Sequence, residues 1–220
     1  MKRRDALRWL GTSSGLVLLS SCGGGGDDGG ALVDAGVDPD ALVLPDGAIC
    51  RATTNDVLGP FHREGAPSRM MIASATEPGD RIALAGIVHA DDCATPLAGA
   101  ALDVWQADAT GAYHEPNAGE PFRLRGQLDA AADGTWAVDT IRPGNYRNGP
   151  GWRPAHIHFI VSHPGYRTLT TQLYFAGDPY LPPNDSCTTC GSDDPARIIP
   201  LVARAGGGFT GDFRIVLARA

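Results

Sequence analysis

Two histidines separated by a single residue, His156 and His158, are the side chains of this sequence best suited to chemistry. In a β-strand, alternate side chains face opposite sides, so the two imidazoles share one face while Ile157 and Phe159 share the other. Neutral imidazole is the commonest protein ligand for transition metals, and the pair could therefore bind one metal ion. An isolated His-x-His pair is more often ordinary, half-exposed strand, so other residues must decide between these interpretations.

Two tyrosines supply further candidate ligands. Tyr113 and Tyr146 each lie just beyond a predicted strand, and Tyr146 precedes His156 by ten residues. A lone loop tyrosine usually serves packing. Two phenols brought beside two imidazoles could instead bind Fe(III), because this hard, highly charged ion favours ionised phenolate oxygen.

Short strands separated by clusters of Gly, Pro and Asp are predicted from about residue 80 onward. The Asp133-Gly134 pair predicts a β-hairpin. No segment has a helical period over three turns, and strands at intervals of about ten residues predict an all-β, antiparallel β-sandwich with long loops that carry the site. The expected strands cover residues 82–88, 102–105, 122–129, 136–138, 156–161, 169–175 and 213–217.

The beginning of the chain predicts export. Residues 1–21 combine Arg3 and Arg4, which resemble a twin-arginine signal, with an apolar run too short to span a bilayer as a mature helix. Residues 19–22, Leu-Ser-Ser-Cys, resemble a bacterial lipobox in which Cys22 is lipidated. The alternative is an ordinary signal peptide with a chance cysteine. We expect a bacterial periplasmic or cell-envelope lipoprotein that reaches the membrane through its lipid anchor only.

Residues 22–48, rich in Gly and Asp, predict a flexible linker, and residues 49–220 predict the folded domain. The whole chain of 220 residues carries a net charge of -7 although its first 21 residues are basic, so the domain itself is acidic. An acidic domain does not match the basic face that a nucleic-acid backbone requires.

Four cysteines remain beside Cys22, and an even number in an exported protein favours disulfides. Of the three possible pairings we predict Cys50 with Cys93, and Cys187 with Cys190. The alternative, a zinc ribbon that uses all four, lacks the paired spacing of such sites.

Five sets of short motifs occur between Leu58 and Pro179. Together and in this order they resemble the intradiol ring-cleavage dioxygenases, the family of protocatechuate 3,4-dioxygenase and catechol 1,2-dioxygenase. The motifs are Gly59-Pro60-Phe61 with Gly65-Ala66-Pro67; Val104-Trp105-Gln106-Ala107-Asp108 with Gly111-x-Tyr113; Pro143-Gly144-x-Tyr146; Arg153-Pro154-Ala155-His156-Ile157-His158-Phe159; and Thr171-Gln172-Leu173-Tyr174-Phe175.

The resemblance implies that Tyr113, Tyr146, His156 and His158 hold one non-haem Fe(III) per chain. The implied substrates are a catechol-type diphenol and O2, and the ring would open between its two hydroxylated carbons to give a muconate-type diacid. Tyr146 matches the phenolate that leaves the iron when substrate binds and then acts as a base.

Other matching positions imply catalytic roles for Arg153 and Gln172 beside the substrate, which Arg153 also helps to bind. The alternatives are a surface salt bridge for Arg153 and a polar strand residue for Gln172. Gly59 and Pro60 match a loop that lines the substrate pocket, although His62 stands where many relatives have tyrosine.

Two other classes of function fit parts of the sequence. A cupin-like Fe(II) or Zn enzyme would need a carboxylate soon after the His-x-His pair, but no Asp or Glu occurs between His158 and Asp178. A catalytically silent, prealbumin-like binding or spacer module would share the sandwich, but all four ligand positions are intact. The sequence does not define the oligomeric state.

Overall fold

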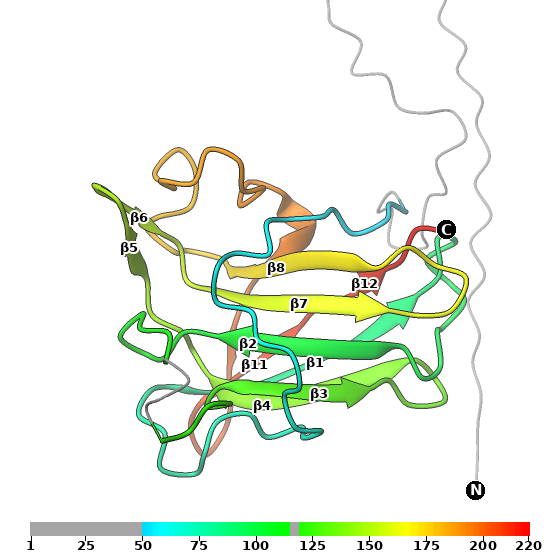
Figure 1. Ribbon diagram of the computed structural model, residues 1–220, viewed down its shortest axis with the longest axis horizontal. Coiled ribbons are helices and arrows are strands. Elements are labelled where there is room, and N and C mark those ends of the chain that lie inside the picture. The colour runs from blue at the N-terminus through cyan, green and yellow to red at the C-terminus, as the bar shows by residue number, and fades with distance from the viewer. Residues whose placement is uncertain (1–49, 115–118) are drawn as a thin grey trace, which may run out of the picture. The chain divides into compact units, whose positions relative to one another are not determined.

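Two β-sheets packed face to face form the part of the chain that a computed structural model describes, residues 50–114 and 119–220 (Figure 1). The predicted signal peptide, Cys22 and the linker to residue 48 lie outside these residues. An all-β sandwich is therefore confirmed.

The first sheet is built around β1 (Arg81–His89), the longest strand described. Five described strands form this sheet, and β4 (Thr135–Ile141) pairs with β1 in antiparallel orientation. The others are β10 (Val202–Ala203), β11 (Phe209–Asp212) and β12 (Ile215–Val216). Both β11 and β12 run parallel to β1, so the prediction of a purely antiparallel sandwich was wrong for this edge.

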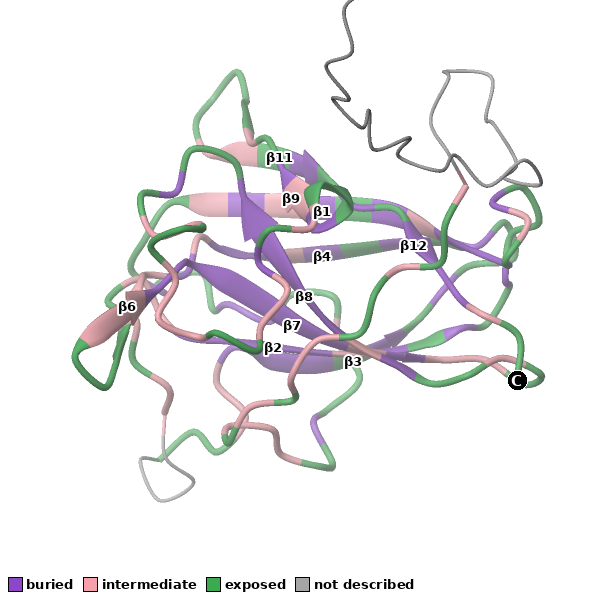
Figure 2. Ribbon diagram, turned by 90° about the horizontal axis from the view of Figure 1, so that it is seen from above, coloured by how far each residue is buried: buried purple, intermediate pink, exposed green. Residues whose placement is uncertain are grey.

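The second sheet carries the two histidines on β7 (His156–Ser162), which lies between β2 (Ala101–Gln106) and β8 (Leu169–Phe175). The described edges are β3 (Arg125–Asp129), antiparallel to β2, and β9 (Ile198–Ile199), parallel to β8. Central strands of this sheet are almost continuously buried (Figure 2).

Two small elements are not part of the two main sheets. A ribbon of β5 (Tyr146–Asn148) and β6 (Gly151–Arg153) precedes the His156 strand. The helix η1 (Pro195–Arg197) is a single short turn. Within residues 50–114 and 119–220, no helix is long and apolar enough to cross a membrane.

Strand alternation on β7 separates the core from the site. Phe159 is fully buried between the sheets, with its ring 5.5 Å from that of Trp136 on β4 and 5.6 Å from that of Phe213. Ile157 and Val161 face the same core. Burying each such side chain contributes about 1.5–3 kcal/mol, which fixes the register of β7 and directs its histidines to the outer face of the sheet.

The predicted hairpin at Asp133-Gly134 was wrong, although a tight turn does occur there. Gly134 has φ +74°, and Gly134 N donates to Ala131 O (2.9 Å). The chain nevertheless crosses from β3 in one sheet to β4 in the other, and each strand pairs elsewhere. A turn signature specifies the local bend, whereas burial of apolar faces decides which strands pair.

Two predicted strands begin or continue differently. The strand expected over residues 122–129 starts at Arg125, because Leu124 adopts φ +55°, a left-handed conformation that no regular strand contains. Near the C-terminus, two short strands replace the single one expected. Between them, Phe213 O approaches Gly86 so closely that a Cβ at position 86 would lie 1.9 Å from it.

An N-terminal arm, residues 50–67, covers the outer face of the second sheet (cyan in Figure 1). Cys50 at its start is disulfide-bonded to Cys93 beyond β1. The arm then crosses the strands in order and places a roof over the histidine face. Its hydrogen bonds are Asp56 N to Thr170 O (2.8 Å) and Gln172 Nε2 to Val57 O (2.7 Å) on β8, His62 Nε2 with Asp103 Oδ2 (3.1 Å) on β2, and Gln127 N to Pro67 O (3.0 Å) on β3.

Candidate metal centre

His156 and His158 face outward from β7 yet are each only 2% exposed, because the arm and the loops cover them. Burial lowers the pKa of His156 to about 3 and that of His158 well below its ordinary value. Both imidazoles are therefore neutral at physiological pH. His156 Nδ1 lies 2.7 Å from Pro154 O, so Nδ1–H donates to this carbonyl and Nε2 keeps its lone pair for a ligand.

Tyr113 and Tyr146 converge on the same point. The hydroxyl of Tyr113 lies 3.0 Å from His158 Nε2 and 3.4 Å from His156 Nε2. The ring of Tyr146 lies 5.5 Å from that of His156 and 5.8 Å, edge-on, from that of Tyr113. The structure thus brings together the four side chains that the sequence predicts as metal ligands.

The donor spacing fits one metal ion. Ligand atoms about 2.1 Å from one ion are about 3.0 Å apart at a right angle and about 3.4 Å apart at a tetrahedral angle, which matches the Tyr113-to-histidine separations. Within the two described ranges, no group of three or more His, Cys, Asp and Glu side chains is arranged to hold a metal. The phenols are therefore needed to complete the donor set.

Electrostatics define what kind of ion the cluster suits. Burial raises the pKa of Tyr113 and of Tyr146 above the ordinary phenol value, so neither ionises readily by itself. A bound cation of high charge reverses this preference, since it stabilises the phenolate directly. Two neutral imidazoles and two phenols match Fe(III) better than a divalent ion that prefers carboxylates.

Glycines allow the two tyrosine loops to touch. A Cβ at Gly111 would lie 2.2 Å from Asn145 O, and a Cβ at Gly144 would lie 2.5 Å from Ala109 O. Each glycine precedes one of the two tyrosines of the cluster by two residues. The repeated Gly-x-Tyr pattern at 111–113 and 144–146 therefore has a physical cause: the backbones that carry Tyr113 and Tyr146 are in contact.

Asp108 organises the loop that carries Tyr113. Its Oδ1 accepts hydrogen bonds from Thr110 N (2.8 Å) and Ala112 N (3.0 Å), and its Oδ2 from His114 Nε2 (3.0 Å). Burial opposes ionisation of Asp108, but these hydrogen bonds lower its pKa below the ordinary value. On the other side of His114, Nδ1 contacts Arg123 (3.1 Å), so Nε2 carries the proton and His114 links the loop to a cationic partner.

Aromatic rings enclose the ligands. Trp105 stacks on His158, with centroids 4.7 Å apart and planes 8° from parallel, and Phe61 of the arm stacks on Tyr113 at 4.1 Å. Gly59, at φ +71°, lies over His158, where a Cβ would be 3.4 Å from Cε1. Gly59 thus lies beside the cluster, while Pro60 next to it is exposed, and a role of either in substrate binding stays a prediction.

Arg153 is a buried residue at the site, 3% exposed, rather than part of a surface salt bridge. It stands opposite Tyr146 in the β5–β6 ribbon, and the phenol of Tyr146 is one of the groups that raise the pKa of Arg153 against the opposing effect of burial. Its NH2 group donates to Gln172 Oε1 (3.0 Å) and to Tyr174 Oη (3.1 Å). Gln172, fully buried opposite His158 on β8, therefore contacts Arg153 and the arm.

Several acidic residues around the site were not identified from the sequence. Asp178 accepts hydrogen bonds from Ala155 N (3.0 Å) and from the Asn145 amide (2.8 Å), so it positions the residues next to His156 and Tyr146. Its carboxylate is engaged there and is not a metal ligand of the cupin type. Asp56 accepts from Tyr174 Oη (2.8 Å), and Asp185 pairs with Arg153. Long-range pairings of this kind leave no local pattern in a sequence.

The four cysteines of the domain form two disulfides, Cys50–Cys93 and Cys187–Cys190, with Cα atoms 5.8 and 5.4 Å apart. They are therefore not zinc ligands.

Comparison with known proteins agrees with this geometry. A family model described as "Dioxygenase" matches residues 58–199, more than half of the chain and every residue of the cluster. The chain belongs to the intradiol ring-cleavage dioxygenase family.

Among curated members of this family, chlorocatechol 1,2-dioxygenase of Rhodococcus opacus is 39% identical over 64% of this chain and 63% of its own length. Catechol 1,2-dioxygenase 2 of Acinetobacter lwoffii is 35% identical over 59% of this chain and 53% of its own length. The chain thus spans between half and two thirds of these curated relatives.

Solved structures of family members show the same fold. The dioxygenase domain of a dioxygenase carbohydrate-binding protein fusion from Streptomyces sp. SirexAA-E is 37% identical, with a TM-score of 0.65 over 77% of this chain and 100% of that domain. The 3-chlorocatechol 1,2-dioxygenase of R. opacus is 28% identical, with a TM-score of 0.69 over 77% of this chain and 74% of its own.

Replacing Tyr113 by Phe removes one donor and should weaken iron retention. Losing a residue that only supports a metal ligand typically lowers metal affinity about 10- to 100-fold, and losing Tyr113 should cost at least as much. The variant should also lose part of the visible absorption that phenolate-to-Fe(III) charge transfer produces. Iron analysis and a visible spectrum measure both effects. Tyr166→Phe is the matched control, because Tyr166 packs on His163 and Arg219. An unchanged spectrum and iron content in Tyr113→Phe would remove Tyr113 from the centre.

Proposed function

We propose that this protein is an exported, non-haem Fe(III)-dependent intradiol dioxygenase. It cleaves a catechol-type ring between the two hydroxylated carbons and incorporates both atoms of O2, giving a muconate-type diacid. The observation that carries this proposal is the convergence of two phenols and two buried, neutral imidazoles in one cluster. Family membership and relatives named for catechol and chlorocatechol support the substrate class.

Tyr113, Tyr146, His156 and His158 would hold the iron. Fe(III) held there would supply a Lewis acid and a template for the diphenol. The protein's own part is to orient the diphenol, to move its protons and to exclude water. Trp105, Phe61 and the arm perform the last task, since they close the face on which the histidines lie.

Tyr146 is the residue placed to accept a proton from the incoming diphenol. It is partly exposed, whereas the histidines are buried, so it lies on the side open to a ligand. Burial raises the pKa of its phenol, and the neighbouring Arg153 cation works in the opposite direction. A phenolate formed there is a strong base, and Arg153 helps to hold its charge.

Arg153 would stabilise negative charge that develops on the substrate ring. Guanidinium stays protonated, and its planar fork keeps a fixed orientation when its neighbours are fixed. Burial alone would lower the pKa of Arg153, but the facing Tyr174 and Tyr146 phenols and the Asp185 carboxylate raise it above the ordinary value. A permanent, preoriented cation beside the reacting ring matches this task.

Export as a lipoprotein through Cys22 is part of the same proposal and rests on the sequence motif at residues 19–22. Membrane fractionation of wild type and Cys22→Ala tests it. The variant should leave the membrane fraction, and unchanged membrane association would show that the lipobox interpretation is wrong.

The reaction is tested by incubating iron-loaded protein with catechol, protocatechuate or hydroxyquinol under ¹⁸O₂. A diacid opened between the hydroxylated carbons and carrying two ¹⁸O atoms is expected from at least one of them. Arg153→Ala should keep iron, colour and measurable diphenol binding but lose about 100- to 1000-fold in kcat, the range for removing one preorganised donor.

Arg219→Ala is the control for losing a paired arginine, because Arg219 forms an exposed ion pair with Asp91 (side chains 67% and 40% exposed). Its kcat should match wild type. Near-wild-type kcat in Arg153→Ala would make Arg153 a structural residue, and a product opened beside the hydroxylated carbons would contradict the intradiol reaction itself.

A further inference from the structure

Arg153 has a buried anionic partner supplied by a loop outside both sheets. Its Nε lies 3.0 Å from Oδ1 of Asp185, and the two side chains are 4% and 2% exposed. Among the described residues, the carboxylate within ion-pair distance of Arg153 is that of Asp185. Removing one member of a buried ion pair leaves the charge of the other uncompensated, which costs folding stability. The folded protein therefore keeps the guanidinium of Arg153 beside the Asp185 carboxylate.

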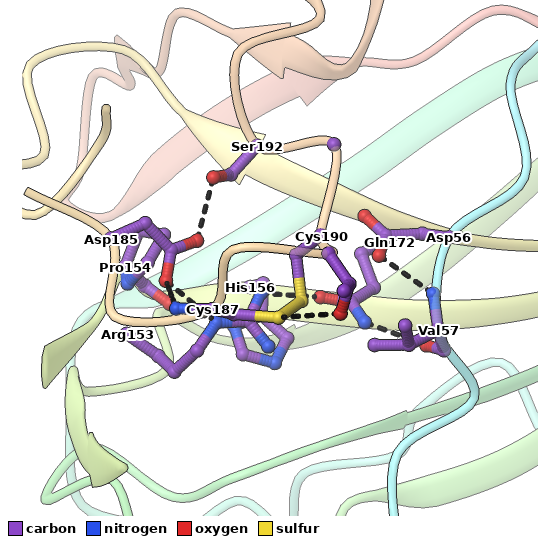
Figure 3. The surroundings of a disulfide bond; sticks show 12 residues. Asp56, Val57, Arg153, Pro154, His156, Gln172, Asp185, Cys187, Cys190 and Ser192 are labelled. Atoms are coloured by element: carbon purple, nitrogen blue, oxygen red, sulfur yellow. Dashed lines mark hydrogen bonds and ion pairs between the residues drawn. A yellow bond between two sulfur atoms is a disulfide. The ribbon is translucent and has the colours of Figure 1, made fainter. Parts of the chain in front are cut away.

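Asp185 is itself held from both ends of a small disulfide loop (Figure 3). Its Oδ1 accepts a hydrogen bond from Cys187 N (2.8 Å), and its Oδ2 accepts one from Ser192 Oγ (2.6 Å). The Cys187–Cys190 disulfide joins the first of these donors to a residue two positions before the second. The disulfide therefore restricts the backbone that presents both donors to the carboxylate.

Backbone contacts anchor this loop against the strand that carries Arg153. Asp185 forms a bridge with Trp152 of β6, and Ser186 N donates to Trp152 O (3.0 Å). The approach is close enough that a Cβ at Gly151 would lie 2.6 Å from Ser186 Cβ. The loop and the arginine therefore form one local unit.

Two contacts hold the guanidinium of Arg153. Oδ1 of Asp185 forms an ion pair with Nε without a well-directed hydrogen bond, while Gln172 and Tyr174 on β8 accept hydrogen bonds from NH2. A planar group with partners at two of its nitrogens has little rotational freedom, and Arg153 stands opposite Tyr146 of the candidate metal centre in the β5–β6 ribbon. Gln172 and Tyr174 are uncharged acceptors, so Asp185 supplies the charge that makes this orientation specific.

We propose that Asp185, held by the loop closed by the Cys187–Cys190 disulfide, is a positioning residue that orients Arg153 toward the reacting ring. The catalytic consequence rests on the proposed function, whereas the ion pair and its loop do not. Asp185 acts through Arg153 and does not contact the substrate itself.

The proposal is tested with a double-mutant cycle of Arg153→Ala, Asp185→Asn and the two combined. Asp185→Asn should lower kcat about 10- to 100-fold, the usual loss when an outer partner of a site residue is removed, with little change in KM or in the visible band. Because Asp185 acts through Arg153, the double variant should be no slower than Arg153→Ala alone. Asp139→Asn, which removes the partner of Arg81 on the first sheet, should leave kcat unchanged.

Urea unfolding of the same full-length variants supplies a readout that needs no turnover. Each single variant should lower the midpoint, and the double variant should recover part of the loss, since it removes both buried charges together. Additive midpoint shifts, or rate losses that multiply in the double variant, would overturn the proposal. If wild type shows no ring cleavage, the proposed function fails, while the midpoints still decide whether Asp185 is coupled to Arg153.

Two variants, each lacking one of the two disulfides, test the role of the loop. Cys187→Ser/Cys190→Ser should lower kcat in the same way as Asp185→Asn and add nothing to it when combined. Cys50→Ser/Cys93→Ser is the comparison for losing a disulfide: it opens a link between residues 43 positions apart and should reduce stability more, and any change it makes in kcat should multiply with that of Asp185→Asn, because it does not act through Asp185. Wild-type kcat without the Cys187–Cys190 bond would show that the loop does not hold Asp185 for catalysis.

Discussion

The outer face of β7 must be shielded from water, and much of the structure follows from this constraint. Register on β7 is fixed by Ile157, Phe159 and Val161, which are fully buried between the sheets. The same alternation turns His156 and His158 outward, where uncovered imidazoles would be solvated and would titrate near the ordinary histidine pKa of about 6.5. The N-terminal arm crosses β8, β7, β2 and β3 in turn and excludes water from that face. This cover lowers the pKa of both histidines and closes the face on which the candidate metal centre lies.

Polar residues around the cluster then hold the segments that carry its side chains. Asp108 folds the loop of Tyr113, and Asp178 ties the residues beside Tyr146 and His156 to each other. Buried carboxylates are costly unless they are paired, and in this protein each accepts several hydrogen bonds. Asp185 extends the pattern to Arg153. Some of the domain's carboxylates therefore lie inside the protein, where they orient neighbouring side chains.

Sequence reasoning predicted the side chains that converge in the cluster because their signals are local. Alternation in residues 156–161 separates histidines from core, and glycines beside Tyr113 and Tyr146 mark tight loops. It did not find the crossing of Asp133-Gly134 between sheets, the parallel return of β11 and β12 beside β1, or the pairing of Asp185 with Arg153. These features depend on which distant surfaces bury each other, and a sequence window carries no information about that choice. The left-handed Leu124, which delays β3, is likewise imposed by its buried environment.

Resonance Raman spectroscopy of the iron-loaded protein, excited within its visible absorption, addresses the metal centre most directly. If both tyrosines hold Fe(III), enhanced phenolate ring vibrations should appear in two sets in the wild type, and one set should be missing in Tyr113→Phe. Iron bound at one per chain without any enhanced tyrosinate vibration would contradict a centre built from Tyr113, Tyr146, His156 and His158.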